Sequence, residues 1–282
     1  MRFATIIEHG QPCVAVVRDG RVLPLATSDP ELGSLRGIAA SGADGLKRVR
    51  DWVAGQPDRA YRGIDGVELG PAVPDPGAIY TIGLNYATSG ERDGSAPSRP
   101  LVYGKLPSAV VGPGAVVSWD RSLTANVDGE SELGVVIGER AVAVAPADAM
   151  RHVFGYTCIN DISSRDPWLD GDQWLLGKSM AGFCPVGPWV VTGDEIGPGA
   201  LRLGCTINGI AIQDGSTAQL RFSIADVIAY LSRHAALLPG DLIATGTPAR
   251  LDGPLGPDRH LEAGDVVTVW IERIGELTTI IA

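Results

Sequence analysis

Short runs of β-branched and aromatic residues, separated by glycine and proline, recur along the whole chain. Three of them stand in the first part, at residues 3–7, 13–17 and 21–25. Asp19-Gly20, between the second and third runs, is a strong hairpin signal. Residues 45–53 have helical character instead. The first part is therefore predicted to be a small β-rich region with one helix.

Strand-like runs also dominate the rest of the chain, at residues 79–82, 100–104, 133–137, 154–159, 188–191, 203–207, 242–245 and 266–271. One helix is well marked, because Ser223 and Asp226 form the pattern of a capping box. Apolar residues at helical spacing follow, and we expect Pro239-Gly240 to stop this helix. The pattern predicts a strand-dominated α+β protein whose mostly antiparallel sheets bend or close around a site.

A proline-rich passage at residues 71–77 separates the two parts of the chain. Its composition is typical of a linker. We predict a small N-terminal domain over residues 1–70 and a larger domain over residues 71–282. The chain is long enough for such an arrangement.

Composition narrows the choice of compartment and partner. With 45% hydrophobic and 20% charged residues, the chain resembles an ordinary soluble protein. Its formal charge of −10, with no local cluster of Lys or Arg, argues against nucleic acid as a partner. We expect no membrane association, since there is neither a signal-peptide core nor an apolar run of spanning length. The scattered cysteines suggest free thiols and a cytoplasmic location.

Carboxylates at the start of one strand-like run carry the most informative chemistry. Glu130 and Glu132 are two residues apart, so their side chains leave a strand on the same face. They repel each other, and the pKa of one should rise unless a cation lies between them. Asp161 ends another β-favouring run. Such an oxygen-ligand set suits Mg²⁺, Mn²⁺ or Ca²⁺, although a bare Glu-x-Glu is more often a solvated strand face.

A series of motifs, in order from residue 79 to the C-terminus, resembles the fumarylacetoacetate hydrolase family. The motifs are Ile82-Gly83-Leu84-Asn85-Tyr86, Asp128-Gly129-Glu130-Ser131-Glu132-Leu133, Asn160-Asp161-Ile162-Ser163-Ser164-Arg165-Asp166, Lys178-Ser179, and Pro239-Gly240-Asp241 running to Thr247-Pro248. The resemblance implies a mixed β-roll C-terminal domain. It also implies a divalent cation held by Glu130, Glu132 and Asp161. The implied partners are a small-molecule substrate, with a 1,3-dicarbonyl or 2-oxo acid group, and a second copy of the chain in a homodimer.

The resemblance also gives roles to residues around the cation. Lys178 is the candidate electrophile whose ammonium faces the developing negative charge, with a surface lysine as the alternative. Arg165 is a candidate for holding a substrate carboxylate, with an ion pair to Asp161 or Asp166 as the alternative. Two further candidates for substrate binding are Gln173 and Thr247, and the loop around Thr247 has a structural turn as its alternative.

One segment departs from the family pattern. After Asn-Tyr the family commonly has a histidine, and three residues later a glutamate, on a short lid helix, and this pair activates the hydrolytic water. Here Ser89 stands at the histidine position and Arg92 at the glutamate position, while Gly90 disfavours a helix. Glu91 is one place off and is the candidate base. Of the histidines, His260 is the one that could reach over the site.

Three functions are compatible with this departure. The first is a metal-dependent C–C bond hydrolase that acts on an acylpyruvate-like 2-oxo acid through a metal-stabilised enolate. The second is a decarboxylase, tautomerase, isomerase or dehydratase of the same substrate class, which needs no activated water. The third is a catalytically inactive ligand-binding homologue. We place the hydrolase first, by analogy with the family.

Overall fold

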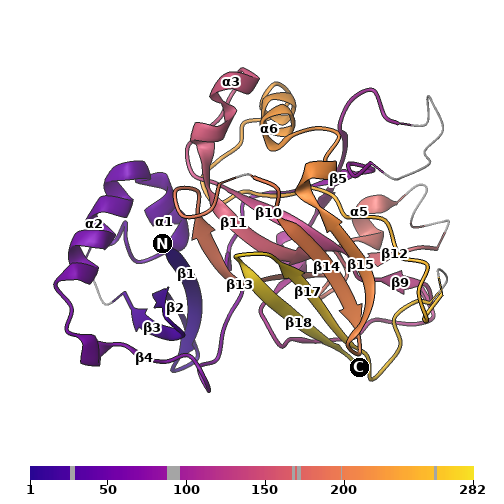
Figure 1. The fold of residues 1–282 in the computed structure, drawn as a ribbon, viewed down its shortest axis with the longest axis horizontal. Helices are drawn as coiled ribbons and strands as arrows, with labels where there is room; N and C mark the ends of the chain where they lie inside the picture. The colour runs from indigo at the N-terminus through magenta and orange to yellow at the C-terminus, as the bar shows by residue number, and fades with distance from the viewer. Residues whose placement is uncertain (26–28, 88–95, 167–168, 170–172, 198, 257–258) are drawn as a thin grey trace.

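The computed structural model describes residues 1–282 apart from 26–28, 88–95, 167–168, 170–172, 198 and 257–258. Its centre is a mixed 11-stranded sheet in the order β4-β3-β2-β1-β13-β11-β10-β16-β5-β6, with β7 paired to β13 (Figure 1). The strands are β1 (Arg2–Glu8), β2 (Gln11–Arg18), β3 (Arg21–Pro24), β4 (Arg62–Gly63), β5 (Ile79–Gly83), β6 (Leu101–Lys105), β7 (Val110–Val111), β10 (Ser131–Ile137), β11 (Val153–Asn160), β13 (Cys184–Thr192) and β16 (Leu242–Ala244).

A second sheet of five strands packs against this one. Its order is β15 (Ile210–Ser216), β14 (Arg202–Ile207), β17 (Val266–Ile271), β18 (Gly275–Ile281) and β8 (Val116–Val117), and β9 (Val127–Asp128) pairs separately with β12 (Ser163–Ser164). Most pairs are antiparallel, and the parallel ones are β16 with β5, β13 with β7 and β18 with β8. The predicted strand-dominated α+β fold with mixed sheets is confirmed.

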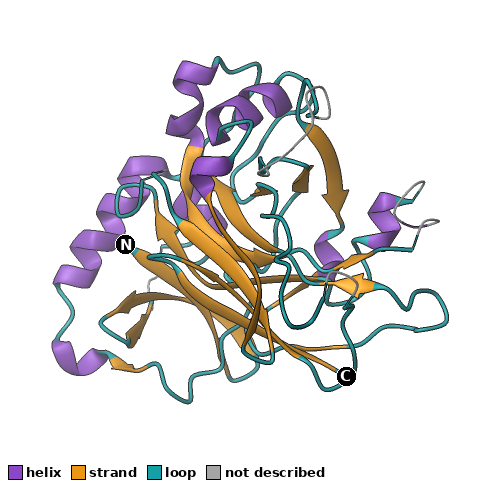
Figure 2. Cartoon of the chain, turned by 45° about the vertical axis from the view of Figure 1, so that its right-hand side comes forward, coloured by secondary structure: helices purple, strands orange, loops and turns teal. Residues whose placement is uncertain are grey.

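Helices are few and short, as Figure 2 shows. They are α1 (Leu35–Ala40), α2 (Gly42–Ala54), α3 (Pro146–Ala149), α5 (Trp174–Gly177) and α6 (Ile224–Ser232), with 3₁₀ turns η1 (Asp58–Ala60), η2 (Pro107–Ala109), η3 (Met150–His152) and η4 (Thr217–Gln219). The predicted capping box of α6 is present. The predicted end of α6 at Pro239-Gly240 is wrong. The helix ends at Ser232, because Leu237 exchanges backbone hydrogen bonds with Ala141 and needs an extended chain there.

The N-terminal strands join the same sheet as the rest of the chain. β1 pairs with β13, and Phe3 lies opposite Val190. The proline-rich passage packs against this junction, since Ala72 is buried and its N–H donates to the carbonyl of Val186 at 3.0 Å. The domain boundary between residues 70 and 71 stays a prediction. Within the described ranges, none of the helices has the length and apolar character needed to span a membrane.

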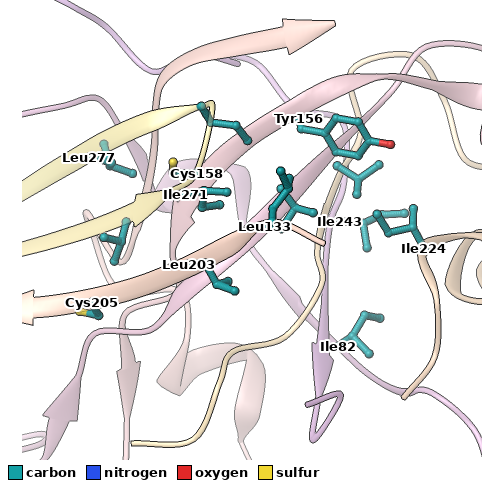
Figure 3. Packing of buried hydrophobic residues seen from close by; sticks show 14 of the residues in the cluster. Ile82, Leu133, Tyr156, Cys158, Leu203, Cys205, Ile224, Ile243, Ile271 and Leu277 are labelled. Carbon is teal, nitrogen blue, oxygen red and sulfur yellow. The ribbon is translucent and has the colours of Figure 1, made fainter. Parts of the chain in front are cut away.

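β10 is buried along its whole length. Leu133 belongs to the apolar cluster that β10 shares with the second sheet, where Leu203 and Ile271 also pack (Figure 3). Val136, on the other face, belongs to the cluster that includes residues of α1 and α2. Because β10 is covered on both faces, the carboxylate of Glu132 near its start lies inside the protein rather than on a solvated face.

Candidate active site

The antiparallel pairing of β10 with β11 brings the acidic motif residues together. Glu132 lies opposite Ile159, and the N–H of Asp161 donates to the carbonyl of Glu130 at 2.9 Å. Carboxylate oxygens of Glu130, Glu132 and Asp161 consequently lie within 4.8 Å of one another. Glu132 and Asp161 are buried, and Glu130 is partly buried. The arrangement is a convergent set of oxygen donors, which is the geometry that a metal site requires.

A glycine at a left-handed position holds Glu132 in place. The N–H of Gly246 donates to Oε2 of Glu132 at 2.6 Å. Gly246 has φ +99°, and a Cβ there would lie 2.9 Å from Cβ of Asn85, so only glycine fits. Asn85 fixes this loop in turn, because its amide donates to the carbonyl of Thr245 at 2.8 Å and accepts from the N–H of Phe222 at 2.9 Å. The Gly-Leu-Asn-Tyr motif therefore positions a metal-ligand candidate.

Two buried ammonium groups hold Asp161. Nζ of Lys178 donates to Oδ2 of Asp161 at 2.6 Å and lies 3.6 Å from Oε2 of Glu130. Nζ of Lys105 donates to Oδ1 of Asp161 at 2.5 Å and to the carbonyl of Ile162 at 3.0 Å. In the sequence, Lys105 matches a lysine of the family that the motifs resemble, but its role there is less certain and we do not include it among the candidate site residues.

The charges in this cluster shift one another's pKa values. Burial raises the pKa of Glu132 well above its usual range, and the neighbouring Asp161 and Glu130 raise it further. Burial acts in the same direction on Asp161, but Lys105 and Lys178 outweigh it and lower the pKa of that carboxyl. Burial opposes the charge on Lys178, yet the carboxylates, Asp161 first, raise its pKa. The pKa of Glu132 is therefore raised first by burial and then by the neighbouring carboxylates, and the second effect is the one that the sequence predicted.

Arg165 forms ion pairs with acids of the Asp128–Glu132 motif. Its guanidinium donates to Glu130 and, through Nε, to Asp128 at 3.2 Å. The charge of Glu130 raises the pKa of Arg165. Asp128 also accepts from Nδ1 of His260 at 2.8 Å and lies 3.4 Å from Nη1 of Arg250. Asp128 therefore contacts Arg165, His260 and Arg250 beside the acidic cluster. The sequence motif that contains Asp128 did not predict the contact with Arg250.

The remaining candidates from the sequence are Thr247, Gln173 and Glu91, and of these Thr247 lines the site's cavity. The Thr247 hydroxyl donates to the carbonyl of Ser131 at 2.9 Å and accepts from Nε2 of Gln213 at 2.7 Å, so it also braces the start of β10. Gln173 is exposed just before α5 and is not among the residues that line the site's cavity. Glu91 lies outside the described residues. The roles of these three in binding or catalysis stay predictions.

A cavity of about 410 Å³ opens onto the acidic cluster. Its lining includes Lys178, Arg165 and Thr247, and also the aromatic side chains of Tyr103 and Trp174. This size suits a small organic acid. The donor set fits Mg²⁺ or Mn²⁺, because it consists of carboxylates alone and because a divalent cation would favour the charged form of the buried Glu132. The cluster is therefore a candidate metal-dependent site for a small molecule.

Comparison with known proteins agrees with this class of fold and site. Residues 78–282 match the sequence profile of the fumarylacetoacetate (FAA) hydrolase C-terminal family. The chain belongs to the fumarylacetoacetate hydrolase family. An uncharacterized protein of Staphylococcus haemolyticus is 37% identical over 230 residues, which is 81% of this chain and 76% of that protein.

Solved structures of similar fold include named enzymes. A fumarylacetoacetate hydrolase from the psychrophilic Exiguobacterium antarcticum has a TM-score of 0.86 and 30% identity, covering 100% of this chain and 99% of that one. A maleylpyruvate hydrolase from Sphingobium sp. SYK-6, in complex with manganese(II) and pyruvate, has a TM-score of 0.80 and 26% identity over 100% and 99%. A 5-carboxymethyl-2-hydroxymuconate delta-isomerase from Mycobacterium smegmatis has a TM-score of 0.78 and 27% identity over 100% and 98%.

Proposed function

We propose that this protein is a divalent-metal-dependent enzyme that hydrolyses a C–C bond in an acylpyruvate-like 2-oxo acid. The observation that carries the proposal is the buried cluster of Glu130, Glu132 and Asp161 with the Lys178 ammonium beside it, at a cavity of about 410 Å³. The hydrolases among the solved relatives support the reaction class, and the manganese(II) and pyruvate held by one of them support the metal and the 2-oxo acid.

The residues of the cluster have distinct tasks in this proposal. Glu130, Glu132 and Asp161 would hold Mg²⁺ or Mn²⁺, which when bound supplies a Lewis acid toward the oxygens of a 2-oxo acid. Lys178 keeps its proton, since its pKa is raised. Its ammonium stabilises the negative charge that develops on the substrate as the C–C bond breaks. Arg165 lines the same cavity, and its planar guanidinium suits the substrate's carboxylate.

Hydrolysis also needs a base for the attacking water. In the described part of the cavity, each lining carboxylate is already bonded to a cation or, for Glu132, to the N–H of Gly246. We assign the base to Glu91, because it stands one place from the position at which the family commonly has a glutamate. A second candidate function is favoured by two facts: the described carboxylates of the cavity are already bonded, and Ser89 and Arg92 stand where the family commonly has its histidine and glutamate. That candidate is enolate chemistry without activated water, by a decarboxylase, tautomerase, isomerase or dehydratase, and an isomerase is among the solved relatives.

Product analysis separates these functions. The protein is incubated with acetylpyruvate or oxaloacetate, with Mg²⁺, Mn²⁺ or a chelator, and the products are identified by NMR. Formation of acetate and pyruvate that the chelator abolishes supports the hydrolase. Metal-dependent loss of CO₂ or tautomerisation without C–C hydrolysis would replace it with the second candidate. Metal-dependent binding without turnover of any substrate would indicate an inactive homologue.

A further inference from the structure

The lining of the cavity has a charged part and an apolar part, and they come from different elements. The charged part includes Asp128 of β9 and Arg250 from the loop after β16, in addition to the acidic cluster. One apolar region of the lining is formed by Leu84, Leu101, Tyr103 and Trp174, which lie just after β5, on the edge strand β6 and at the start of α5. We call these four residues the apolar wall.

The apolar wall is built around a stacked pair of rings. Tyr103 and Trp174 have ring centroids 4.3 Å apart and an interplanar angle of 26°. The Tyr103 ring lies across the backbone of Gly83, since a Cβ at Gly83 would be 2.7 Å from Cε2 of Tyr103 and 3.4 Å from a methyl of Leu101. Glycine at this position leaves the room that the ring occupies. The aromatic surface is therefore formed in advance of any ligand.

The apolar wall adjoins the reacting centre. The N–H of Lys178 donates to the carbonyl of Trp174 at 3.0 Å, so the two residues lie one helical turn apart. The Lys178 ammonium itself is turned toward Asp161 and Ser163, at 2.6 Å and 2.7 Å. A substrate whose 2-oxo acid end lies at the acidic cluster thus has the apolar wall within reach of its other end.

No residue of the apolar wall carries a charge, and two of its members are notably open, with Leu84 68% and Leu101 37% exposed. The nearby guanidinium groups, Arg165 and Arg250, belong to the charged part and share Asp128 as a partner. A second carboxylate placed on the apolar wall would give up part of its hydration without gaining a cation from any of the four wall residues. An aromatic or aliphatic group there would bury apolar surface and stack on the rings.

We infer that the substrate is an acylpyruvate-class acid with a single carboxylate and an apolar acyl group, preferably aromatic, which packs on the apolar wall. This inference rests on the proposed function for the placement of the 2-oxo acid end. In the reaction, the bond between the acyl carbon and the methylene carbon breaks. Water supplies hydroxide to the acyl carbon and a proton to the methylene carbon, so the products are an apolar carboxylic acid and pyruvate, and no oxidant or reductant is required.

The test compares benzoylpyruvate with acetylpyruvate and with succinylpyruvate, which carries a second carboxylate. The Mg²⁺-loaded protein should have a kcat/KM for benzoylpyruvate at least about tenfold above that for either other probe, since stacking and burial of a phenyl group are worth on the order of 1.4 kcal/mol or more. Trp174→Ala should lower kcat/KM for benzoylpyruvate about tenfold more than for acetylpyruvate, mainly through KM. Trp174→Phe should restore most of the difference. Trp52→Ala, on α2, is the matched control and should leave all three values unchanged.

Equilibrium binding keeps this inference separate from the proposed function. If no probe is hydrolysed, the proposed function fails. Calorimetric titration of the Mg²⁺-loaded protein with benzoylpyruvate and with succinylpyruvate then still tests whether the apolar wall binds an apolar acyl group. Tighter binding of benzoylpyruvate that Trp174→Ala removes supports the apolar wall as the acyl site. Equal or tighter binding of succinylpyruvate overturns the inference. So does fast hydrolysis with a preference for succinylpyruvate, although that result would uphold the hydrolase itself.

Discussion

The floor and the apolar wall of the same cavity are held in different ways. The floor, which we define as Glu130, Glu132, Asp161 and Lys178, stands around the paired central strands β10 and β11 and is tied by hydrogen bonds to buried partners. The residues of the apolar wall lie just after β5, on the edge strand β6 and on the short helix α5. A change in the floor leaves a buried charge unpaired, whereas a change in the wall alters packing at an edge.

This difference predicts that the floor and the apolar wall tolerate substitution to different degrees. The floor tolerates few substitutions, because each of its carboxylates is bonded to a cationic side chain or to a backbone N–H. Loss of such a partner costs several kcal/mol of stability. Side chains on an edge strand, on a short helix or in a surface segment can be substituted with little loss of stability of the sheet. The chemistry therefore follows from the floor, while the substrate and the reaction type depend on residues around it.

The largest expected effect comes from removing one floor carboxylate. Glu132→Ala should abolish metal-dependent activity and the stabilisation of the fold by Mg²⁺ or Mn²⁺, which is worth roughly 2.7 kcal/mol at 100 times the Kd. The same loss is expected for the corresponding variants of Glu130 and Asp161. Thermal melts with and without cation measure it. Glu139→Ala, an exposed glutamate just after the same strand, is the control. An equal cation shift in Glu132→Ala and wild type would remove Glu132 from the metal site.

The next effect concerns the floor's cation. Lys178→Met keeps the length of the side chain and removes the charge that faces the substrate. If the ammonium stabilises an enolate-like charge, kcat should fall roughly 10²-fold or more, with little change in metal affinity. Lys47→Met, on the exposed face of α2, controls for loss of a surface charge. Near-normal turnover in Lys178→Met would return this lysine to a structural role beside Asp161.

The sequence predicted the floor better than the wall for a physical reason. The three floor carboxylates lie at the start or the end of two strand-like runs, and antiparallel pairing of those runs is enough to make Glu132 and Asp161 converge. Lys105 joins them from β6, and Arg250 from a distant loop, so their roles depend on tertiary packing that local patterns do not encode. Tyr103 reaches the wall only because Gly83, on the paired strand, leaves room for its ring.

The fold shows the same division. Strand-like runs with β-branched residues became strands nearly where predicted, and residues 266–271 match β17 in full. The end of α6 was wrong because a long-range pairing, Leu237 with Ala141, overrode a helical periodicity that continued past Ser232. Helix α1 was not predicted, since its six residues carry too short a pattern.

A smaller effect is expected from repairing the lid sequence. Water activation by a positioned base is worth about 10²- to 10⁴-fold, and a grafted pair should recover part of it, about tenfold. The triple variant Ser89→His, Gly90→Ala, Arg92→Glu should raise C–C hydrolysis of acetylpyruvate relative to any decarboxylation or tautomerisation. Gly90→Ala alone is its control, because it changes helix propensity without adding a base. Unchanged product ratios, together with full activity in Glu91→Gln, would mean that the base lies elsewhere.

The smallest effect is a dependence of the free energy of unfolding on pH, which we expect from the buried carboxyl of Glu132 in the metal-free protein. The pKa of Glu132 is raised above its ordinary value of 4.5 in the metal-free fold, first by burial and then by Asp161 and Glu130. A raised pKa means that its contribution to stability is fully present below the unfolded pKa and is lost as the pH rises through the folded one. Asp161 has the opposite sign, because its pKa is lowered from 3.8, so its contribution is lost only in stronger acid.

As the pH rises above 4.5, therefore, the contribution of Glu132 to stability is lost, whereas that of Asp161 is kept. In a chelator, the metal-free protein should lose up to about 1.4 kcal/mol of stability per pH unit through this carboxyl. Glu132→Gln, which stays neutral and keeps its shape, should remove that slope. Saturating Mg²⁺ should also remove it, because the cation favours the charged carboxylate and its binding strengthens as the proton leaves. Melting temperatures across this range in chelator and in Mg²⁺ measure both effects. If Glu132→Gln and wild type give parallel curves in chelator, Glu132 does not change its charge over this range and the raised pKa is wrong.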